Sequence, residues 1–235
     1  MTAAQVLKAL KDASAPAHRD KVGRFFRGND DGSAPDNRIM GVEFGTIFAV
    51  AKQFANTPLQ EIEKLLESPL YEARMAAVSI MDFQARAGST TPAQRKALFD
   101  LYLRRHDRIN NWDLVDRAAP HVVGGYLADR PRKVLYRLAR SKNPWERRTA
   151  IVSTYYFIRA GDVKDTFGIA ALLAKDGHEL VQKATGSWLR EAGKKDRAQL
   201  VAFLETHAAG MPATMLRYAT ENLGKDLRAK LAGVR

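Results

Sequence analysis

The sequence predicts an all-α fold in which short helices stack as helical-hairpin repeats. Segments of about 10 to 16 residues with apolar side chains at helical spacing follow one another along the 235-residue chain. Short breaks containing Pro, Ser or Asp separate them, and two helices occupy roughly 35 to 40 residues, which is typical of stacked hairpins rather than of a bundle. No run alternates apolar and polar residues over six positions, so strand signals are nearly absent. A stack of tilted helix pairs curves and leaves a concave face that fits a rod-shaped ligand.

Start and stop signals place the helices of the first half. Residues 3–13 and about 17–27 show helical patterns, and a polar loop over 28–35 follows. The next helix is expected over about 41–54. Thr57 is then expected as an N-cap with Pro58 as the first helical residue. Further helices are expected over about 72–87 and from a cap within 89–92 to about residue 105.

One segment, residues 110–116, concentrates the candidate chemistry, with the sequence Asn-Asn-Trp-Asp-Leu-Val-Asp. The Asn pair favours a helix start because a short amide accepts a hydrogen bond from a first-turn N–H. Trp112 and Asp116 then stand four residues apart on one helical face. This face combines a flat aromatic ring with a carboxylate.

The two acids of this segment have different explanations. Asp113 lies in the first turn, where an acid favours the helix dipole, and Arg117 four residues on is its expected partner. Asp116 has no basic residue at its helical neighbour positions. It is either a functional carboxylate or a surface acid, solvated or paired with a distant Arg, and the segment alone leaves both open.

The charge balance indicates a polyanionic partner. Lys and Arg number 38 against 26 Asp and Glu, which leaves a formal net charge of +12 at pH 7. Nucleic acid is the simplest such partner. Hydrophobic residues make up 46% of the chain, enough for a core, so we expect one domain spanning residues 1–235.

Other classes of site are excluded by composition. Cysteine is absent, and the 5 His residues show no ligand spacing, so no metal site is expected. No apolar run approaches the roughly 20 residues of a membrane helix, and the first residues lack the apolar core of a signal peptide. We therefore expect a cytoplasmic, monomeric protein without membrane contact.

A basic run begins in the second half. From Asp129 to Arg148, eight basic residues stand against two acidic ones. A solvated helical face usually mixes both signs, so we interpret the excess as a phosphate-contact surface, with a solvated face as the alternative. The basic residues of the run are Arg130, Arg132, Lys133, Arg137, Arg140, Lys142, Arg147 and Arg148.

Another helix is predicted at the end of this run, with Asn143 as its cap and Pro144 at its first position. Arg148, Val152 and Tyr155 follow at helical spacing, which places this Arg beside an apolar ridge. A groove-lining Arg in such a place needs an anionic partner, and the helix amino end favours phosphate as well.

Three blocks together carry a family resemblance. Residues 110–116, then 145–151 (Trp-Glu-Arg-Arg-Thr-Ala-Ile), then 182–191 (Gln-Lys-Ala-Thr-Gly-Ser-Trp-Leu-Arg-Glu) resemble the signature blocks of bacterial AlkD-type alkylpurine DNA glycosylases, in order and spacing. The similarity extends from about Phe25 to Tyr218 and includes residues 211–218 (Met-Pro-Ala-Thr-Met-Leu-Arg-Tyr).

The resemblance implies a curved solenoid of antiparallel HEAT-like repeats with duplex DNA in a concave, basic groove. It implies base-excision repair by a monofunctional DNA glycosylase that hydrolyses the N-glycosidic bond of N3- and N7-alkylated purines, without base flipping and without a cofactor. Trp112 and Asp116 match the family's catalytic Trp and Asp, and Arg148 matches its backbone-binding Arg. The further DNA contacts that we expect are Arg137, Arg140, Lys142, Arg147, Ser187 and Arg190.

One position departs from the family pattern. Ser187 stands where the family commonly has a second Trp, and Trp188 comes one residue later. A shift of one residue turns a side chain by about 100° around a helix, so we expect Trp188 to pack in the core. The alternative to an enzyme is therefore a non-catalytic DNA-binding or scaffold solenoid that has lost part of the site.

Overall fold

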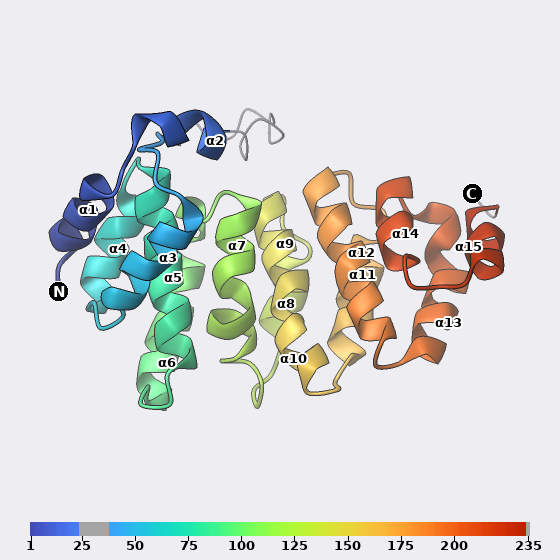
Figure 1. Cartoon of the computed structure of the whole chain (residues 1–235). Coiled ribbons are helices and arrows are strands. Elements are labelled where there is room, and N and C mark those ends of the chain that lie inside the picture. Colours follow the sequence, from blue (N-terminus) through green and yellow to red (C-terminus); the bar gives the residue numbers. More distant parts are fainter. Residues whose placement is uncertain (24–37, 234–235) are drawn as a thin grey trace. The chain divides into compact units, whose positions relative to one another are not determined.

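A computed structural model describes residues 1–23 and 38–233, and all regular elements of this part are helices (Figure 1). Extended pairing is limited there to one isolated bridge between Arg38 and Leu70. The all-α prediction is confirmed. Residues 24–27 of the expected second helix, and the expected loop over 28–35, lie outside the described residues. No helix within the described ranges is long and apolar enough to cross a membrane.

The chain divides into two compact units, Met1–Tyr126 and Leu127–Arg235. The first unit contains α1 (Ala3–Asp12), α2 (Arg19–Gly23), α3 (Phe44–Gln53), α4 (Leu59–Glu67), α5 (Tyr71–Arg86), α6 (Pro92–Arg104) and α7 (Trp112–Ala118). It also has 3₁₀ turns at Pro16–His18 and His106–Arg108, and a π-helical turn, η3, at Ala119–Gly124. The assignment of a single domain over residues 1–235 stays a prediction.

The second unit contains α8 (Lys133–Leu138), α9 (Pro144–Ser153), α10 (Tyr155–Arg159), α11 (Lys164–Leu173), α12 (Glu179–Gly193), α13 (Arg197–His207), α14 (Ala213–Ala219) and α15 (Lys225–Ala232), with a 3₁₀ turn at Ala208–Gly210. Helix α9 packs on α8, α11 and α12, and α12 packs on α11, α13 and α14. Each of these helices thus contacts helices one to three elements away along the chain, which is the contact pattern of helical repeats.

Cap residues explain several helix boundaries. Thr91 forms a capping box with Gln94 and is followed by Pro92, so the predicted cap of α6 is confirmed. The predicted cap of α4 is wrong by one residue, because Pro58 is the N-cap and the Thr57 hydroxyl instead donates to the Phe54 carbonyl at the end of α3, at 2.7 Å.

Helix α3 begins later than the expected residue 41. Gly41 has a φ of +92°, a left-handed conformation that ends regular helix. The fully buried Glu72 carboxylate accepts hydrogen bonds from the backbone N–H groups of Met40 and Gly41, at 3.0 and 2.9 Å. This carboxylate holds the chain in its extended approach to α3.

The core of the first unit is α5. Nearly all of its residues are buried, and it packs against α3, α4, α6 and α7. Such a helix normally carries apolar side chains on every face, yet Glu72, Arg74 and Asp82 of α5 are at most 1% exposed. A buried charge is costly unless it is paired and hydrogen-bonded. Each of these three side chains therefore needs polar or charged partners within the core.

Asp82 holds α7 and η3 against α5. Its carboxylate lies 3.1 Å from Nη1 of Arg117 and 2.8 Å from Nδ1 of His121. The Arg117 guanidinium also donates from Nε to Ser79 Oγ at 3.0 Å and lies between two phenyl rings, 4.8 Å from the centre of Phe48 and 4.9 Å from that of Phe83. Stacking and ion pairing together compensate for the burial of this cation.

The start of α7 is tied to the same helix by a second polar contact. The Tyr71 hydroxyl donates to Oδ2 of Asp113 inside the core, and both residues are buried. The expected pairing of Asp113 with Arg117 is therefore wrong: Asp113 points inward to Tyr71, and Arg117 is held by Asp82. Helix α7 thus has a polar anchor on α5 at each end.

We expect Asp82→Asn to lower the free energy of unfolding by about 2 kcal/mol, because it removes the counter-charge of the Arg117 guanidinium, whose side chain is 20% exposed. Denaturant unfolding of the variant measures the effect. Asp100→Asn is the matched control, since Asp100 pairs with Lys96 on an exposed face and should change stability little. Equal stability of the two variants would contradict the structural role of Asp82.

Gly186 sets the approach of α12 to α14. A Cβ atom at this position would lie 2.5 Å from the Met215 carbonyl oxygen and 2.6 Å from Tyr218 Cβ. Gly186→Ala should therefore cost about 1–3 kcal/mol in unfolding free energy, because backbone must move to admit the methyl group. Gly45→Ala is the control. This position in α3 has open space around it and should be neutral or slightly stabilising when changed. Thermal melts of both variants compare the two.

Candidate functional site

Helix α7 begins at Trp112, as the Asn pair predicted, but without the predicted amide cap. Asn111 is the N-cap, and its side chain makes no capping hydrogen bond to the first turn. The side chain of Asn111 is instead buried, with 1% of its surface exposed. The prediction of the helix start is confirmed, whereas the proposed amide cap is wrong.

Trp112 and Asp116 lie on the outer side of α7. Both are partly exposed, while Asp113, Leu114 and Val115 between them are buried. The four-residue spacing places the indole and the carboxylate on one face. The inner side of the helix carries the contacts to α5, so Trp112 and Asp116 are held in place from the opposite side of the helix.

Asp113 lies close enough to Asp116 for the two carboxylates to interact. Burial, and to a smaller extent the negative charge of Asp116, raise the pKa of Asp113 to about 6 against the opposing effect of hydrogen bonds from Tyr71 and from the Leu114 N–H. The Leu114 bond measures 2.8 Å. Near neutral pH the first turn of α7 therefore holds a second, buried carboxylate next to the exposed one.

Helix α9 positions Arg148 in the second unit. Asn143 caps the helix by accepting from the Trp145 N–H at 2.9 Å, and Pro144 is its first residue, so this predicted start is confirmed. Arg148 is only 6% exposed and donates from Nη1 to the Leu180 carbonyl in the first turn of α12. Its predicted place beside an apolar ridge is confirmed by this burial.

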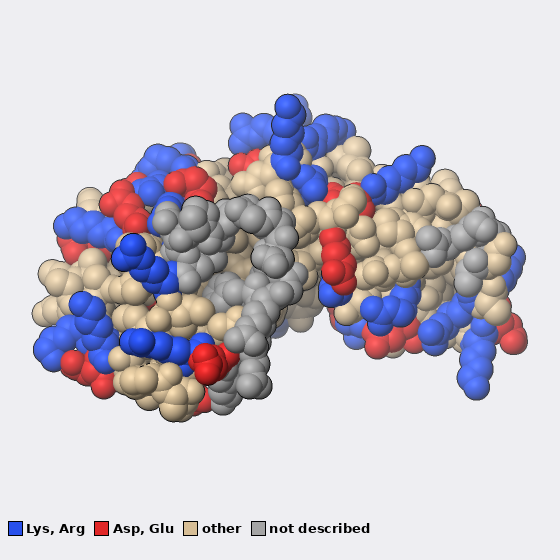
Figure 2. Space-filling view, turned by 90° about the horizontal axis from the view of Figure 1, so that it is seen from above, with Lys and Arg blue, Asp and Glu red and all other residues tan. Residues whose placement is uncertain are grey.

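The residues of the basic run have different environments. Arg147 donates two hydrogen bonds to Asp176, at 2.6 and 3.0 Å. Arg132 forms ion pairs with Asp162 and Asp165. Arg130 pairs with its neighbour Asp129. The exposed members of the run are Lys133, Arg137, Arg140 and Lys142. Figure 2 shows Lys and Arg side chains spread over the visible surface, with acidic side chains interspersed.

The third sequence block lies on α12. Ser187 is partly exposed, next to Gly186 at the α12–α14 contact. The Trp188 ring stacks on Tyr155 with centroids 4.9 Å apart and is also partly exposed, so the prediction of a core position holds only in part. Arg190 pairs with Glu191 and Glu221.

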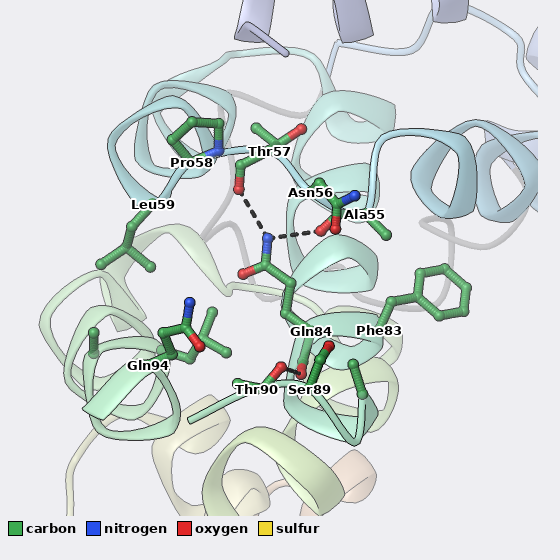
Figure 3. A pocket seen from close by; sticks show the side chains of 13 residues that line it. Ala55, Asn56, Thr57, Pro58, Leu59, Phe83, Gln84, Ser89, Thr90 and Gln94 are labelled. Atoms are coloured by element: carbon green, nitrogen blue, oxygen red, sulfur yellow. Dashed lines mark hydrogen bonds between the residues drawn. The ribbon is translucent and has the colours of Figure 1, made fainter. Parts of the chain in front are cut away.

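A separate cleft of about 470 Å³ lies in the first unit between the α3–α4 turn, the end of α5, and α6 (Figure 3). The Gln84 amide donates there to the carbonyls of Ala55 and Thr57, at 2.7 and 2.8 Å. No acidic or basic side chain lines the cleft, and neither Trp112 nor Asp116 belongs to it. It offers no group for acid–base chemistry.

Trp112 and Asp116 share a face in the first unit, while the predicted DNA contacts and Ser187 belong to the second. The sequence did not reveal the roles of Tyr71, Asp82 and His121. Tyr71 and Asp82 contact the buried side of α7, and His121 of η3 pairs with Asp82. One signal was present: Asp82 is the single charged residue in the mostly apolar stretch from Val78 to Phe83. An acid in such a place is more often a buried partner than a solvated one.

The fold is similar to that of a solved structure described as a predicted DNA alkylation repair enzyme from Enterococcus faecalis. The identity is 16%, the TM-score is 0.69, and the match covers 90% of this chain and 97% of the other. No protein of curated function shows significant sequence similarity. The model of the family described as DNA alkylation repair enzyme matches residues 6–223. Because this match spans nearly the whole sequence, the chain belongs to the DNA alkylation repair enzyme family.

Proposed function

We propose that the protein is a monofunctional DNA glycosylase that hydrolyses the N-glycosidic bond of N3- and N7-alkylated purines in duplex DNA. Family membership supports repair of alkylated DNA as the process. The arrangement of α7 supports the reaction, since it combines a partly exposed carboxylate and indole on a firmly anchored helix. This arrangement is the observation on which the proposal mainly depends.

The chemistry requires little more than a fixed carboxylate. A purine alkylated at N3 or N7 already carries positive charge, so the base leaves without protonation and a general acid is dispensable. The sugar left behind resembles an oxocarbenium ion, which Asp116 stabilises while it orients the attacking water. Trp112 places its electron-rich face against the same cationic nucleotide and contributes about 0.5–2 kcal/mol.

Anchoring matters because electrostatic catalysis depends on groups that do not reorganise during the reaction. Asp116 is flanked in sequence by Val115, which is buried, and by Arg117, which is stacked between Phe48 and Phe83. Its backbone therefore has little freedom to retreat from a developing positive charge. A surface acid on an unsupported helix would reorient and lose part of this stabilisation.

We assign the DNA backbone contacts to the second unit. Arg148, held against α12, acts on a phosphate, and the exposed Arg137, Arg140 and Lys142 supply the less specific attraction. Arg147 and Arg190 are engaged by acids of the same chain, so their roles are to position α9 and α12 or to exchange partners when DNA binds. Ser187 presents a small hydroxyl where the resemblance implies an aromatic wall.

We expect Asp116→Asn to retain fold and DNA binding but to slow release of 7-methylguanine from a duplex by about 10²-fold or more, the scale for losing one preorganised electrostatic group. Single-turnover release of free base measures it. Asp113→Asn should cost much less. Asp107→Asn, which removes an exposed acid, is the control and should leave the rate unchanged. A wild-type protein that binds DNA without releasing base would favour the non-catalytic alternative.

We expect duplex affinity to fall steeply with salt, with a slope near −0.9 in log K against log salt for each phosphate contact. Replacing Arg137 and Arg140 together by Glu should flatten this slope. The same replacement at Lys8 and Lys64, exposed residues of the first unit that pair with acids of their own helices, makes the same change in net charge. Equal slopes for the two double variants would show that only net charge matters.

A further inference from the structure

The buried carboxylate of Asp113 is the group of α7 that the proposed chemistry does not use. It lies three residues before Asp116 and is 8% exposed. It accepts hydrogen bonds from the Tyr71 hydroxyl of α5 and from the Leu114 N–H of its own helix. A buried acid in the core of a unit is costly to ionise, and an apolar residue would fill the same space without this cost.

We propose that Asp113 is a positioning residue for Asp116: the Tyr71–Asp113 contact fixes the first turn of α7, and ionisation of Asp113 sets the electrostatic field at the Asp116 carboxylate. This inference rests on the proposed glycosylase function and deepens it. It adds a residue that acts through Asp116 without touching the substrate.

Charged and titratable groups of several elements surround Asp113. Tyr71 faces it from α5, with Glu72 and Arg74 next to Tyr71, and Asp116 faces it from α7 itself. On η3, His121 pairs with Asp82. Helix α3 brings Phe44 edge-on to Tyr71, while its Lys52 is exposed.

The sign of the effect follows from the chemistry. The pKa of Asp113 is raised to about 6, so the group becomes ionised as the pH rises through that value. The reaction develops positive charge on the sugar, and a second negative charge on α7 stabilises it. Excision should therefore accelerate above pH 6. Helical neighbours such as Asp113 and Asp116 lie about 5–6 Å apart, and the sugar lies beyond Asp116, so a screened interaction over this longer distance gives about 2- to 10-fold in rate.

The test is the pH dependence of single-turnover 7-methylguanine release between pH 4.5 and 8.5, for wild type, Asp113→Asn and Tyr71→Phe. Asp113→Asn should abolish the inflection near pH 6, and the ratio of wild-type to variant rates cancels any titration of the substrate. Tyr71→Phe should move the inflection upward by about one pH unit, because the lost hydrogen bond favoured the ionised form. Tyr136→Phe is the matched control: it removes a Tyr–Asp hydrogen bond, to Asp165, in the second unit.

Unfolding gives a readout independent of the reaction. The folded-state pKa of Asp113 lies above its unfolded value of 3.8, so the folded state binds the proton more tightly. Its contribution to stability is present at low pH and is lost as the pH rises from about 4 through 6. Asp113→Asn should therefore melt at a higher temperature than wild type at pH 8, and the advantage should shrink towards pH 4.5.

The outcomes are distinguishable. Wild-type protein that releases no base overturns the glycosylase proposal and this inference with it. Active wild type whose pH profile is unchanged in Asp113→Asn overturns the inference alone. Circular dichroism of each variant confirms folding. If Asp113→Asn fails to fold, the shift of the inflection in Tyr71→Phe decides: an upward shift supports the role of Asp113, and no shift overturns it.

Discussion

The ion cluster around Asp82 is the interaction on which the candidate site depends. A carboxylate with 1% exposure gathers Arg117 from α7 and His121 from η3, and the guanidinium is further enclosed by Phe48 and Phe83. Burying the Asp82 carboxylate is unfavourable in itself, and apolar packing often achieves equal stability. The cluster also fixes the orientation of α7 on α5, because a stacked and ion-paired guanidinium has a defined geometry. With the Tyr71–Asp113 contact at its other end, a helix of seven residues acquires an orientation that its own hydrogen bonds do not provide.

In the second unit, most charged side chains of the basic run are ion-paired or exposed. The run from 129 to 148 combines three arginines neutralised by acids of the same chain with four exposed basic side chains and one buried guanidinium. Arg132 illustrates the first kind, since its ion pairs with Asp162 and Asp165 are joined by a stack on the Phe157 ring, 3.6 Å from the ring centre. Arginines of this kind organise the loops between helices. The net positive charge available to a polyanion therefore comes from fewer residues than the sequence count implies.

The helical class, the start of α7 and the caps of α6 and α9 were predictable, because they depend on local patterns such as Thr91 before Pro92 and Asn143 before Pro144. Partners distant in sequence were not. Asp113 was assigned to Arg117 because spacing of four is all that a sequence shows, whereas the actual partner, Tyr71, lies 42 residues away. Asp82 and Glu72 lie on a helix that is buried all round, where periodicity carries little information. The roles of Trp112, Asp116 and Arg148 stay predictions, and their environments are now defined.

Gly186 and Ser187 are adjacent residues under opposite constraints. At 186 the backbone of α14 lies so close that no side chain fits, whereas 187 is partly exposed. In evolutionary terms, one position is closed to change and the next is open, although they share a turn of α12. A lineage can therefore exchange a hydroxyl for an aromatic ring at 187 while the α12–α14 packing stays as it is. On the proposal that Ser187 faces the substrate, single substitutions at this position alter the substrate range at little folding cost, and related proteins with different substrate preferences should differ here before they differ in the core.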